Sequence, residues 1–264
     1  MTERADETIK ALRSGHEDLD SLVRGLAAAD LARRSGAAEW DVAQVLSHLG
    51  SGAEINLASL EAALNDSGAL ADDFNQGVWA RWDAMSREEH AENFLKASEA
   101  LVRRYEGLDA QARQNLRIDL GFLPMPVDVA TAGGLRLNEF TLHTWDVKAA
   151  FDPAATLAPE ATPLLFDQAA LLMGFLGKAG ELGGRPVTIL VNTTSPERSF
   201  GVEVDEQVTL VEAPADPAAT LNTPAEWWLR LVSGRHAPEH TPASVEFTGA
   251  ALTLDDLRRV FPGF

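Results

Sequence analysis

The sequence predicts a two-domain protein, a helical bundle followed by a small α/β domain with an antiparallel sheet. Three observations predict this. Apolar residues recur at three- and four-residue intervals in several long stretches of the first 151 residues. Residues 152–163 are rich in Pro and Ala, the composition of a linker. Short β-branched runs then replace the helical pattern. We therefore expect one domain over residues 1–151 and another over residues 160–264.

Composition limits the classes of function. The chain has 264 residues and a net charge of −18, from 40 acidic against 22 basic residues. Such a surface repels phosphate backbones and anionic membranes. The N-terminus lacks the apolar core of a signal peptide, and nowhere do 18 apolar residues run together. We expect a cytoplasmic protein, a monomer or homodimer, whose partners are small molecules rather than nucleic acid or membranes.

Cysteine is absent from the chain. Its absence excludes disulfides, thiolate metal ligands and a cysteine nucleophile. Any thiol chemistry must therefore use a thiol supplied from outside the protein.

Four long helices are predicted in the first domain. The first covers residues 5–29. The second runs to about Asn65, with Asp41 as its N-cap, although Ser35 or Glu39 would also serve as its start. The third opens with the capping box S-R-E-E and continues through Tyr105. After a short helical piece at 109–116, the fourth begins between 127 and 134 and ends near residue 151. Four such helices predict a four-helix bundle.

Between Ser67 and Met85 the helical pattern breaks, and we expect a connection carrying two tryptophans. Arg81 lies in it and either lines a pocket mouth or stacks on a tryptophan at the surface. Arginine is the side chain best suited to bind a carboxylate through two parallel hydrogen bonds. Arg81 is therefore a candidate for substrate and cofactor binding. His90, in the first turn of the third helix, is expected to be solvated.

The second domain alternates helices and short strands. Thr162-Pro163 predicts an N-cap followed by Pro at the first helical position. The runs V-T-I-L-V-N-T, F-G-V-E-V and Q-V-T-L-V-E predict antiparallel strands. A helix begins at Thr223-Pro224, V-E-F-T-G returns to strand, and a short helix covers residues 254–260. Arg235, next to a glycine that ends a helix, either binds an anionic ligand or caps the helix.

The stretch L-N-E-F-T-L-H-T-W-D, residues 137–146, carries the clearest chemistry. Residues four apart share one face of a helix, so Glu139 and His143 project side by side. Asp146 falls on the same face and can accept a hydrogen bond from the second ring nitrogen of His143. Arg136, three residues before Glu139, either reaches this site as a cation or pairs with an acidic neighbour.

A third ligand has to come from another helix. His48 borders the apolar face of the second helix and points into the helical core. Two histidines and one carboxylate leave coordination positions open, as catalytic metal sites do. The alternative is that these are packed or surface residues, since such pairs arise by chance in helix-rich chains. Gly50 and Gly52 follow His48 and either leave room for a ligand or allow close helix packing.

The other histidines fit a ligand role less well. His16 lies close to the apolar stripe of the first helix and is interpreted as a core or boundary residue. His236 and His240 are four apart, but the Pro between them argues against a helix and a second metal site.

Three segments together resemble the mycothiol-dependent maleylpyruvate isomerase family: E-W-D-V-A-Q-V-L-S-H-L-G, N-E-F-T-L-H-T-W-D and the closing V-E-F-T-G-A-A-L-T-L-D-D-L-R-R-V-F-P-G-F. The resemblance covers nearly the whole chain. It implies a DinB-like metal-binding bundle followed by a sterol-carrier-like α/β domain. It also implies that His48, Glu139 and His143 are the metal ligands. Zinc suits this set best, although Fe, Mn or Ni bind the same ligands.

By this resemblance the cofactors are a divalent metal and mycothiol, a small thiol of actinobacteria. The family reaction is reversible addition of the thiolate to the cis double bond of maleylpyruvate, rotation, and elimination to the trans isomer. Arg81 and Arg235 are the candidates to hold the substrate carboxylates. Three alternatives stay open: a thiol S-transferase, a metal-binding module without catalysis, and a hydrolase that uses metal-bound hydroxide.

Overall fold

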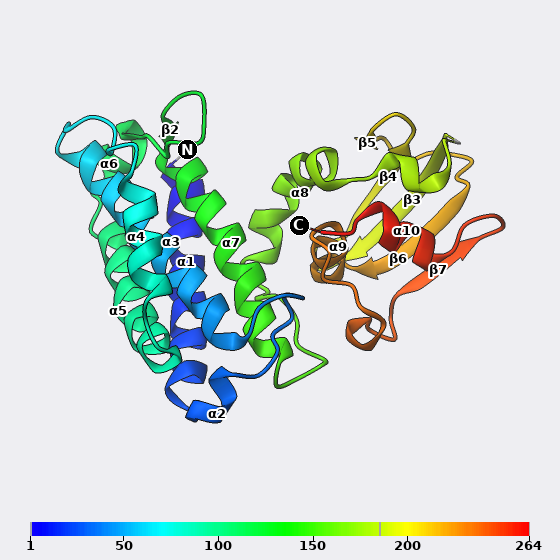
Figure 1. Ribbon diagram of the computed structural model, residues 1–264. Coiled ribbons are helices and arrows are strands. Elements are labelled where there is room, and N and C mark those ends of the chain that lie inside the picture. Colours follow the sequence, from blue (N-terminus) through cyan, green and yellow to red (C-terminus); the bar gives the residue numbers. More distant parts are fainter. Residues whose placement is uncertain (1, 185, 264) are drawn as a thin grey trace. The chain divides into compact units, whose positions relative to one another are not determined.

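The computed structural model of the chain describes residues 2–184 and 186–263. It divides into two compact units, Met1–Phe151 and Asp152–Phe264. The first unit is helical and the second combines helices with a sheet (Figure 1). Among the described helices, none has both the length and the apolar character needed to cross a membrane.

The first unit is built on four long helices: α1 (Thr2–Arg24), α3 (Val42–Leu64), α5 (Arg87–Glu106) and α7 (Val129–Ala149). Each buries an apolar stripe in a common core. Shorter elements connect them: α2 (Ala28–Leu31), α4 (Phe74–Asp83), α6 (Ala110–Asn115), and the paired strands β1 (Arg117–Ile118) and β2 (Val127–Asp128). The predicted four-helix bundle is confirmed.

Side-chain caps fix where the helices begin. The carboxylate of Asp41 accepts a hydrogen bond from the backbone N–H of Gln44, whose side chain bonds back to the N–H of Asp41. Ser86 and Glu89 form the same reciprocal pair at the start of α5. Each capping box satisfies backbone N–H groups that the helix leaves without partners. The two predicted helix starts are confirmed.

Two predictions for the first unit are wrong. The segment predicted as a connection contains α4, whose buried side chains are Val78 and Trp82, one turn apart. One such pair is too short an apolar pattern to stand out from the sequence. His90 was expected to be solvated, but it is 8% exposed and its Nε2 lies 2.8 Å from the carbonyl oxygen of Trp82. The end of α4 covers it, which could not be foreseen without that helix.

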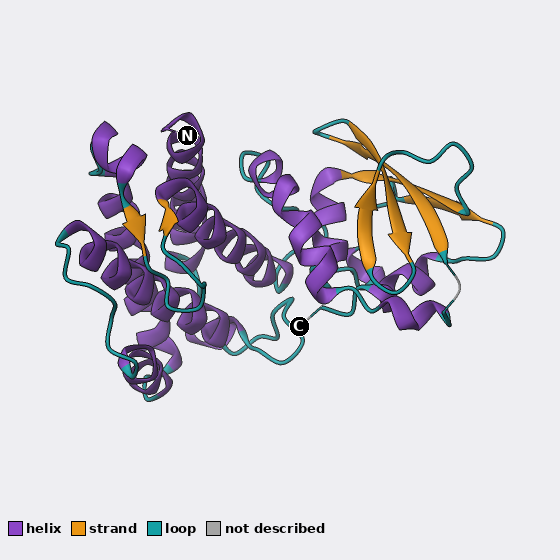
Figure 2. Ribbon diagram, turned by 90° about the horizontal axis from the view of Figure 1, so that it is seen from above, coloured by secondary structure: helices purple, strands orange, loops and turns teal. Residues whose placement is uncertain are grey.

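The second unit carries a five-stranded sheet in the order β5-β4-β3-β6-β7. Figure 2 shows its strands beside the helices of the same unit. The strands are β3 (Val187–Thr194), β4 (Arg198–Val204), β5 (Val208–Val211), β6 (Ala219–Pro224) and β7 (Glu246–Gly249). The helices are α8 (Thr162–Leu176), α9 (Ala225–Val232) and α10 (Leu254–Val260), with 3-10 turns at Ala179–Leu182 and Pro238–His240.

Alternation along the strands places the core on one face of this sheet. Ile189, Val191 and Leu221 are buried with residues of α8, α9 and α10, including Trp228, and with Phe261 just after α10. The neighbouring residues on β3 and β6 are only partly buried. One sheet face is therefore covered by the helices of the same unit.

The sheet is not purely antiparallel as predicted. Strand β6 was not foreseen, and it pairs with β3 in parallel, Ile189 opposite Ala219 and Val191 opposite Leu221. Its sequence, A-T-L-N-T-P, contains Ala, Asn and Pro, which are depleted in strands. The other strand pairs are antiparallel. A smaller difference is that α8 starts at Thr162 itself, with Ala161 as the N-cap.

Candidate metal centre

Helices α3 and α7 bring three metal-ligating side chains together. His48 comes from the second turn of α3, and Glu139 and His143 come from the C-terminal half of α7. The His48 Nε2 lies 3.1 Å from Glu139 Oε2, and the His143 Nε2 lies 3.7 Å from the same oxygen. One ligand atom from each of the three lies within 4.8 Å of the others. Among the described residues this is the one such cluster.

The spacing of these atoms fits a small tetrahedral ion. Ligands at the usual zinc distances form a tetrahedron whose edges are about 3.3 Å long. The two distances to the Glu139 oxygen lie on either side of that value. Two imidazoles and a carboxylate are also a donor set that suits zinc and several other divalent metals. The residues present therefore fit a divalent metal without rearrangement of the helices.

Asp146 fixes the orientation of His143. The two side chains meet with His143 Nδ1 2.8 Å from Asp146 Oδ2. Asp146 is fully buried, and its carboxylate oxygen is placed to accept a hydrogen bond from Nδ1. In the tautomer with the proton on Nδ1, Nε2 keeps its lone pair for a metal. The backbone carbonyl of Asp146 accepts a hydrogen bond of 2.8 Å from the N–H of Gly36. This bond ties the loop before α3 to the end of α7.

The same loop places Trp40 against both imidazoles. Its ring centre lies 5.1 Å from that of His48 and 5.7 Å from that of His143, with which it is stacked at 28°. Sequence reasoning missed Trp40 as part of the site. The available signal was its position immediately before the N-cap of the helix that carries His48. Trp40 forms an apolar wall on one side of the cluster.

Glu139 stays ionised in this setting. Burial alone raises the pKa of a carboxyl group, but the hydrogen bond with His48 and the charges of His143, His48 and Arg136 outweigh it. The Glu139 pKa falls to about 2. The cluster is also reachable, since 45% of the Glu139 side chain and 39% of the His48 side chain are exposed. An anionic ligand group thus faces solvent, as a site that takes up a metal and a further ligand requires.

Within the unit to which each belongs, the two predicted arginines contact groups other than the candidate ligands. The guanidinium of Arg81 pairs with Glu54 and lines a cavity of about 280 Å³ between α3, α4 and α5. None of the three candidate ligands lines that cavity. Arg235 lies in the second unit, where its Nη1 donates to the carbonyl of Ser233. The predicted roles of Arg81 and Arg235 toward a substrate stay predictions.

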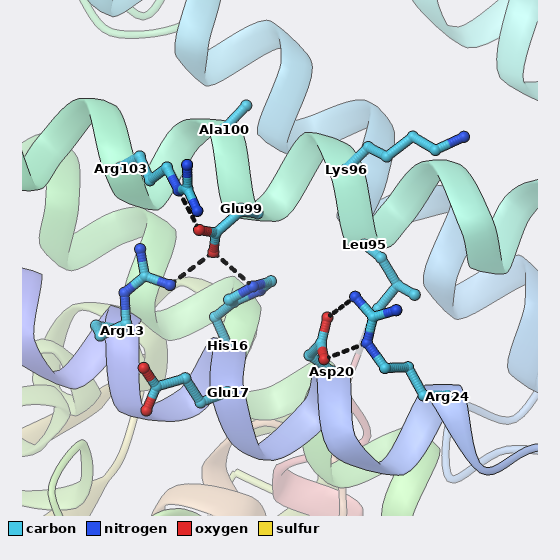
Figure 3. Close-up of a pocket in the computed structure, with 10 residues that line it drawn as sticks. All are labelled: Arg13, His16, Glu17, Asp20, Arg24, Leu95, Lys96, Glu99, Ala100 and Arg103. Atoms are coloured by element: carbon cyan, nitrogen blue, oxygen red, sulfur yellow. Dashed lines mark hydrogen bonds and ion pairs between the residues drawn. The ribbon is translucent and has the colours of Figure 1, made fainter.

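A cavity of about 690 Å³ lies between α1 and α5 and is lined by charged side chains (Figure 3). The carboxylate of Glu99 accepts from Arg13 at 2.6 Å, pairs with Arg103, and lies 2.9 Å from the Nε2 of His16. Asp20 holds Arg24 in the same way. Most of these charges pair with one another, and none of the three candidate metal ligands lines this cavity. His16 is 3% exposed, which agrees with its interpretation as a core histidine.

The chain is similar to known proteins in two comparisons. The family model described as "Mycothiol maleylpyruvate isomerase N-terminal domain" matches residues 12–148. Two crystal structures of a mycothiol-dependent maleylpyruvate isomerase, one of them a single-residue mutant, superpose with a TM-score of 0.65. Each is 11% identical to this chain, and each match covers 92% of both chains, so it shows a shared fold. No curated protein sequence matches.

The family match includes α3, α7 and all three candidate ligands. It extends over more than half of the sequence. The chain therefore belongs to the mycothiol maleylpyruvate isomerase N-terminal domain family.

Proposed function

We propose that this chain is a metal-dependent and mycothiol-dependent isomerase of the maleylpyruvate isomerase type, with His48, Glu139 and His143 as the metal ligands. The observation that carries the proposal is the convergence of these three side chains on one partly exposed point, with Asp146 behind them. Three protein ligands leave room for a further one, as in catalytic sites.

Residues of this chain orient and surround the candidate ligands of the metal centre. Asp146 holds the His143 ring with Nε2 turned to the cluster, and Glu139 supplies a carboxylate that remains charged. The Trp40 ring lies against both imidazoles. A divalent metal bound there would lower the pKa of a thiol that coordinates it. The protein has no cysteine of its own, so the nucleophile of the proposed reaction is an external thiol.

The first experiment measures the metal content of the purified protein by elemental analysis. We expect about one equivalent of divalent metal in the wild type, the stoichiometry of a three-ligand site. His48→Ala should lose it, because two ligands on one helix hold a metal far more weakly than three. His240→Ala, which changes a histidine bonded to the carbonyl of Pro153, is the matched control and should keep it.

The second step tests the thiol. Maleylpyruvate is mixed with metal-loaded protein, with and without mycothiol, and both the trans product and the free thiol are followed. The proposal expects product only with mycothiol, and no net loss of thiol. Stoichiometric thiol consumption would instead identify an S-transferase. A wild type that takes up no metal even after reconstitution would refute the catalytic proposal.

A further inference from the structure

Arg136 is a buried cation beside the candidate metal centre. It lies on α7 one turn before Glu139 and is only 4% exposed. Its Nη2 donates a hydrogen bond of 2.8 Å to the backbone carbonyl of Leu49 on α3. Since Leu49 directly follows His48, the guanidinium packs against the same two helices that present the three candidate ligands.

The guanidinium has donors to spare. An arginine side chain has five N–H groups. Among the described residues, the Leu49 carbonyl is the one acceptor that the Arg136 side chain bonds to. No described carboxylate lies within ion-pair distance of its guanidinium. The Phe140 ring is another neighbour, 5.6 Å from the guanidinium carbon. A buried cation without a paired anion is costly, and proteins keep one mainly where a ligand or partner supplies the charge.

The Arg136 guanidinium is positively charged at neutral pH. Burial lowers the pKa of Arg136 to about 10, against the charges of Glu139 and Tyr105, which act in the other direction. Glu139 is the acidic group whose field reaches Arg136, but its carboxylate is engaged with His48 and His143. A metal on the cluster would add further positive charge. With a metal bound, the positive charges at this site would therefore outnumber the negative ones.

Tyr105 is a second unused donor in the same interior. It lies on α5, is 1% exposed, and its hydroxyl has no hydrogen-bond partner among the residues that the structure describes. Burial raises its pKa to about 12, with the charge of Arg136 opposing, so the phenol is protonated and can donate. Arg136 and Tyr105 thus offer hydrogen-bond donors that have no acceptor among the described residues.

Gly52 leaves room on α3 for the guanidinium of Arg136. A Cβ built at this position would lie 3.1 Å from the Nη1 of Arg136. Gly52 sits one turn after His48 on α3, so the guanidinium packs against the helix that carries this candidate ligand. An arginine edge free of protein acceptors is the geometry that receives a carboxylate through two parallel hydrogen bonds.

We propose that Arg136 binds a carboxylate of the substrate beside the metal centre, with Tyr105 as a second hydrogen-bond donor. The inference rests on the proposed function, because it assigns a substrate-binding residue to the same site. It places that carboxylate beside a residue three positions before Glu139, about 4.5 Å away along the helix axis. It also differs from the sequence-based expectation, which gave this role to Arg81 and Arg235.

The test measures the binding of maleate, a small dicarboxylate, to metal-loaded protein by isothermal titration calorimetry. In Arg136→Met we expect the affinity to fall roughly 30-fold or more, because a desolvated charge partner is lost. Metal content should stay at the wild-type level. Arg136→Lys keeps the charge but loses the planar fork, so a smaller loss, about tenfold, is expected. Tyr105→Phe should lower the affinity less than Arg136→Met.

The control is Arg104→Met. It removes the same charge from the bundle, but from a guanidinium that already pairs with Glu61 at 2.6 Å. Its maleate affinity should equal that of the wild type. Arg81→Met is the competing variant. A loss of affinity in Arg81→Met with none in Arg136→Met would overturn the inference in favour of the sequence-based candidate.

Should Arg136→Met fail to fold, two measurements remain. Arg136→Lys retains a donor for the Leu49 carbonyl, and wild-type affinity in that variant would count against the inference. In the wild type, the side-chain Nε–H signal of Arg136, assigned by its loss in Arg136→Lys, should shift in the NMR spectrum when maleate is added. An unshifted signal under saturating maleate would overturn the inference.

The inference and the proposed function fail separately. If maleate binding depends on Arg136 while the wild type holds no metal, the carboxylate site stands and the metal-dependent function does not. If the protein shows metal and thiol dependence but the Arg136 substitutions leave the maleate affinity unchanged, the proposed function stands and the inference fails. His48→Ala adds a check, since it should still bind maleate through Arg136, although more weakly.

Discussion

At the scale of single residues, His16 is enclosed in a network of charges. Its Nδ1 lies 3.0 Å from the Ser98 hydroxyl, and its Nε2 lies 2.9 Å from Glu99. Burial lowers the His16 pKa below its ordinary value of 6.5, although Glu99 pulls it upward. The folded protein therefore takes up this proton less readily than the unfolded chain.

The sign of the pH effect follows from that difference. Above pH 6.5 the contribution of His16 to stability is fully present, and it is lost as pH falls from 6.5 toward the lower folded pKa. We predict that the wild type loses more unfolding free energy between pH 7 and pH 5 than His16→Gln, whose amide cannot titrate. Urea unfolding at pH 7, 6 and 5 measures this.

The prediction concerns the difference in unfolding free energy between wild type and His16→Gln. Titrating groups that behave alike in both proteins do not contribute to that difference. Glu99 also has a lowered pKa: burial opposes the shift, and the bonds from Arg13 and Arg103 outweigh burial. Its contribution is lost only as pH falls below 4.5, outside this window. Parallel pH profiles for wild type and His16→Gln would contradict the prediction.

The candidate site shows what residue patterns can and cannot predict. Glu139, His143 and Asp146 lie on one helix, so their shared face follows from helix geometry alone. Their meeting with His48 depends on how α3 packs against α7, which the sequence indicated only through its resemblance to a family. The spacing of Arg136 and Glu139 on α7 already offered Arg136 as a nearby cation, whereas Trp40 enters the site through loop contacts. Such contacts are long-range, and no local pattern encodes them.

At the scale of elements, the packing of α3 against α4 depends on the absence of a side chain. A Cβ at Gly50 would lie 2.1 Å from the Trp82 ring, which is 2% exposed and donates its Nε1–H to Glu54. Of the two roles predicted for the glycines after His48, close packing therefore describes Gly50. Gly52 instead makes room for the Arg136 guanidinium.

We predict that Gly50→Ala destabilises the protein by about 1–3 kcal/mol, the usual cost of overpacking. The higher helix propensity of Ala, worth at most about 1 kcal/mol, offsets part of this. Gly77→Ala in α4 is the matched control, since a Cβ there meets nothing within 4 Å. It should stabilise by about 0.5–1 kcal/mol. Urea unfolding of the two variants tests the pair, and a stabilised Gly50→Ala would show that Trp82 can move.

Element predictions succeeded where local signals were strong. The capping boxes at Asp41 and Ser86 fix two helix starts through side-chain bonds within four residues. Helix α4 and strand β6 were missed for opposite reasons. The first buries only two side chains of its own, and the second owes its extended form to pairing with β3, a partner more than two dozen residues away in sequence. Tertiary contacts override weak propensity in both.

At the scale of the whole molecule, each unit has a core of its own. The buried cluster around Trp228 and Val191 belongs to the second unit, whereas His48, Glu139 and His143 all lie in the first. The segment predicted as a linker is part of the second unit rather than a free chain. Leu157 is 2% exposed, and its N–H donates to Glu226 on α9. Composition predicts a break in the pattern there, but not this packing.

Separate cores predict separate responses to metal. Anything that binds only the folded state of the first unit stabilises that unit by mass action, about 2.7 kcal/mol at a hundredfold excess over Kd. We therefore predict two transitions when the full chain is unfolded in a calorimeter. Zinc should raise only one of them, by roughly 5–10 °C for a unit of this size, and EDTA should reverse the rise.

His48→Ala is the control for that experiment, because it leaves both cores in place while removing a ligand. The temperatures of its two transitions should stay the same when zinc or EDTA is added. A zinc-dependent rise in the other transition would mean that the second unit holds metal ligands as well. A single transition that moves as a whole would mean that the two units unfold together, and that the separate cores do not make separate cooperative units.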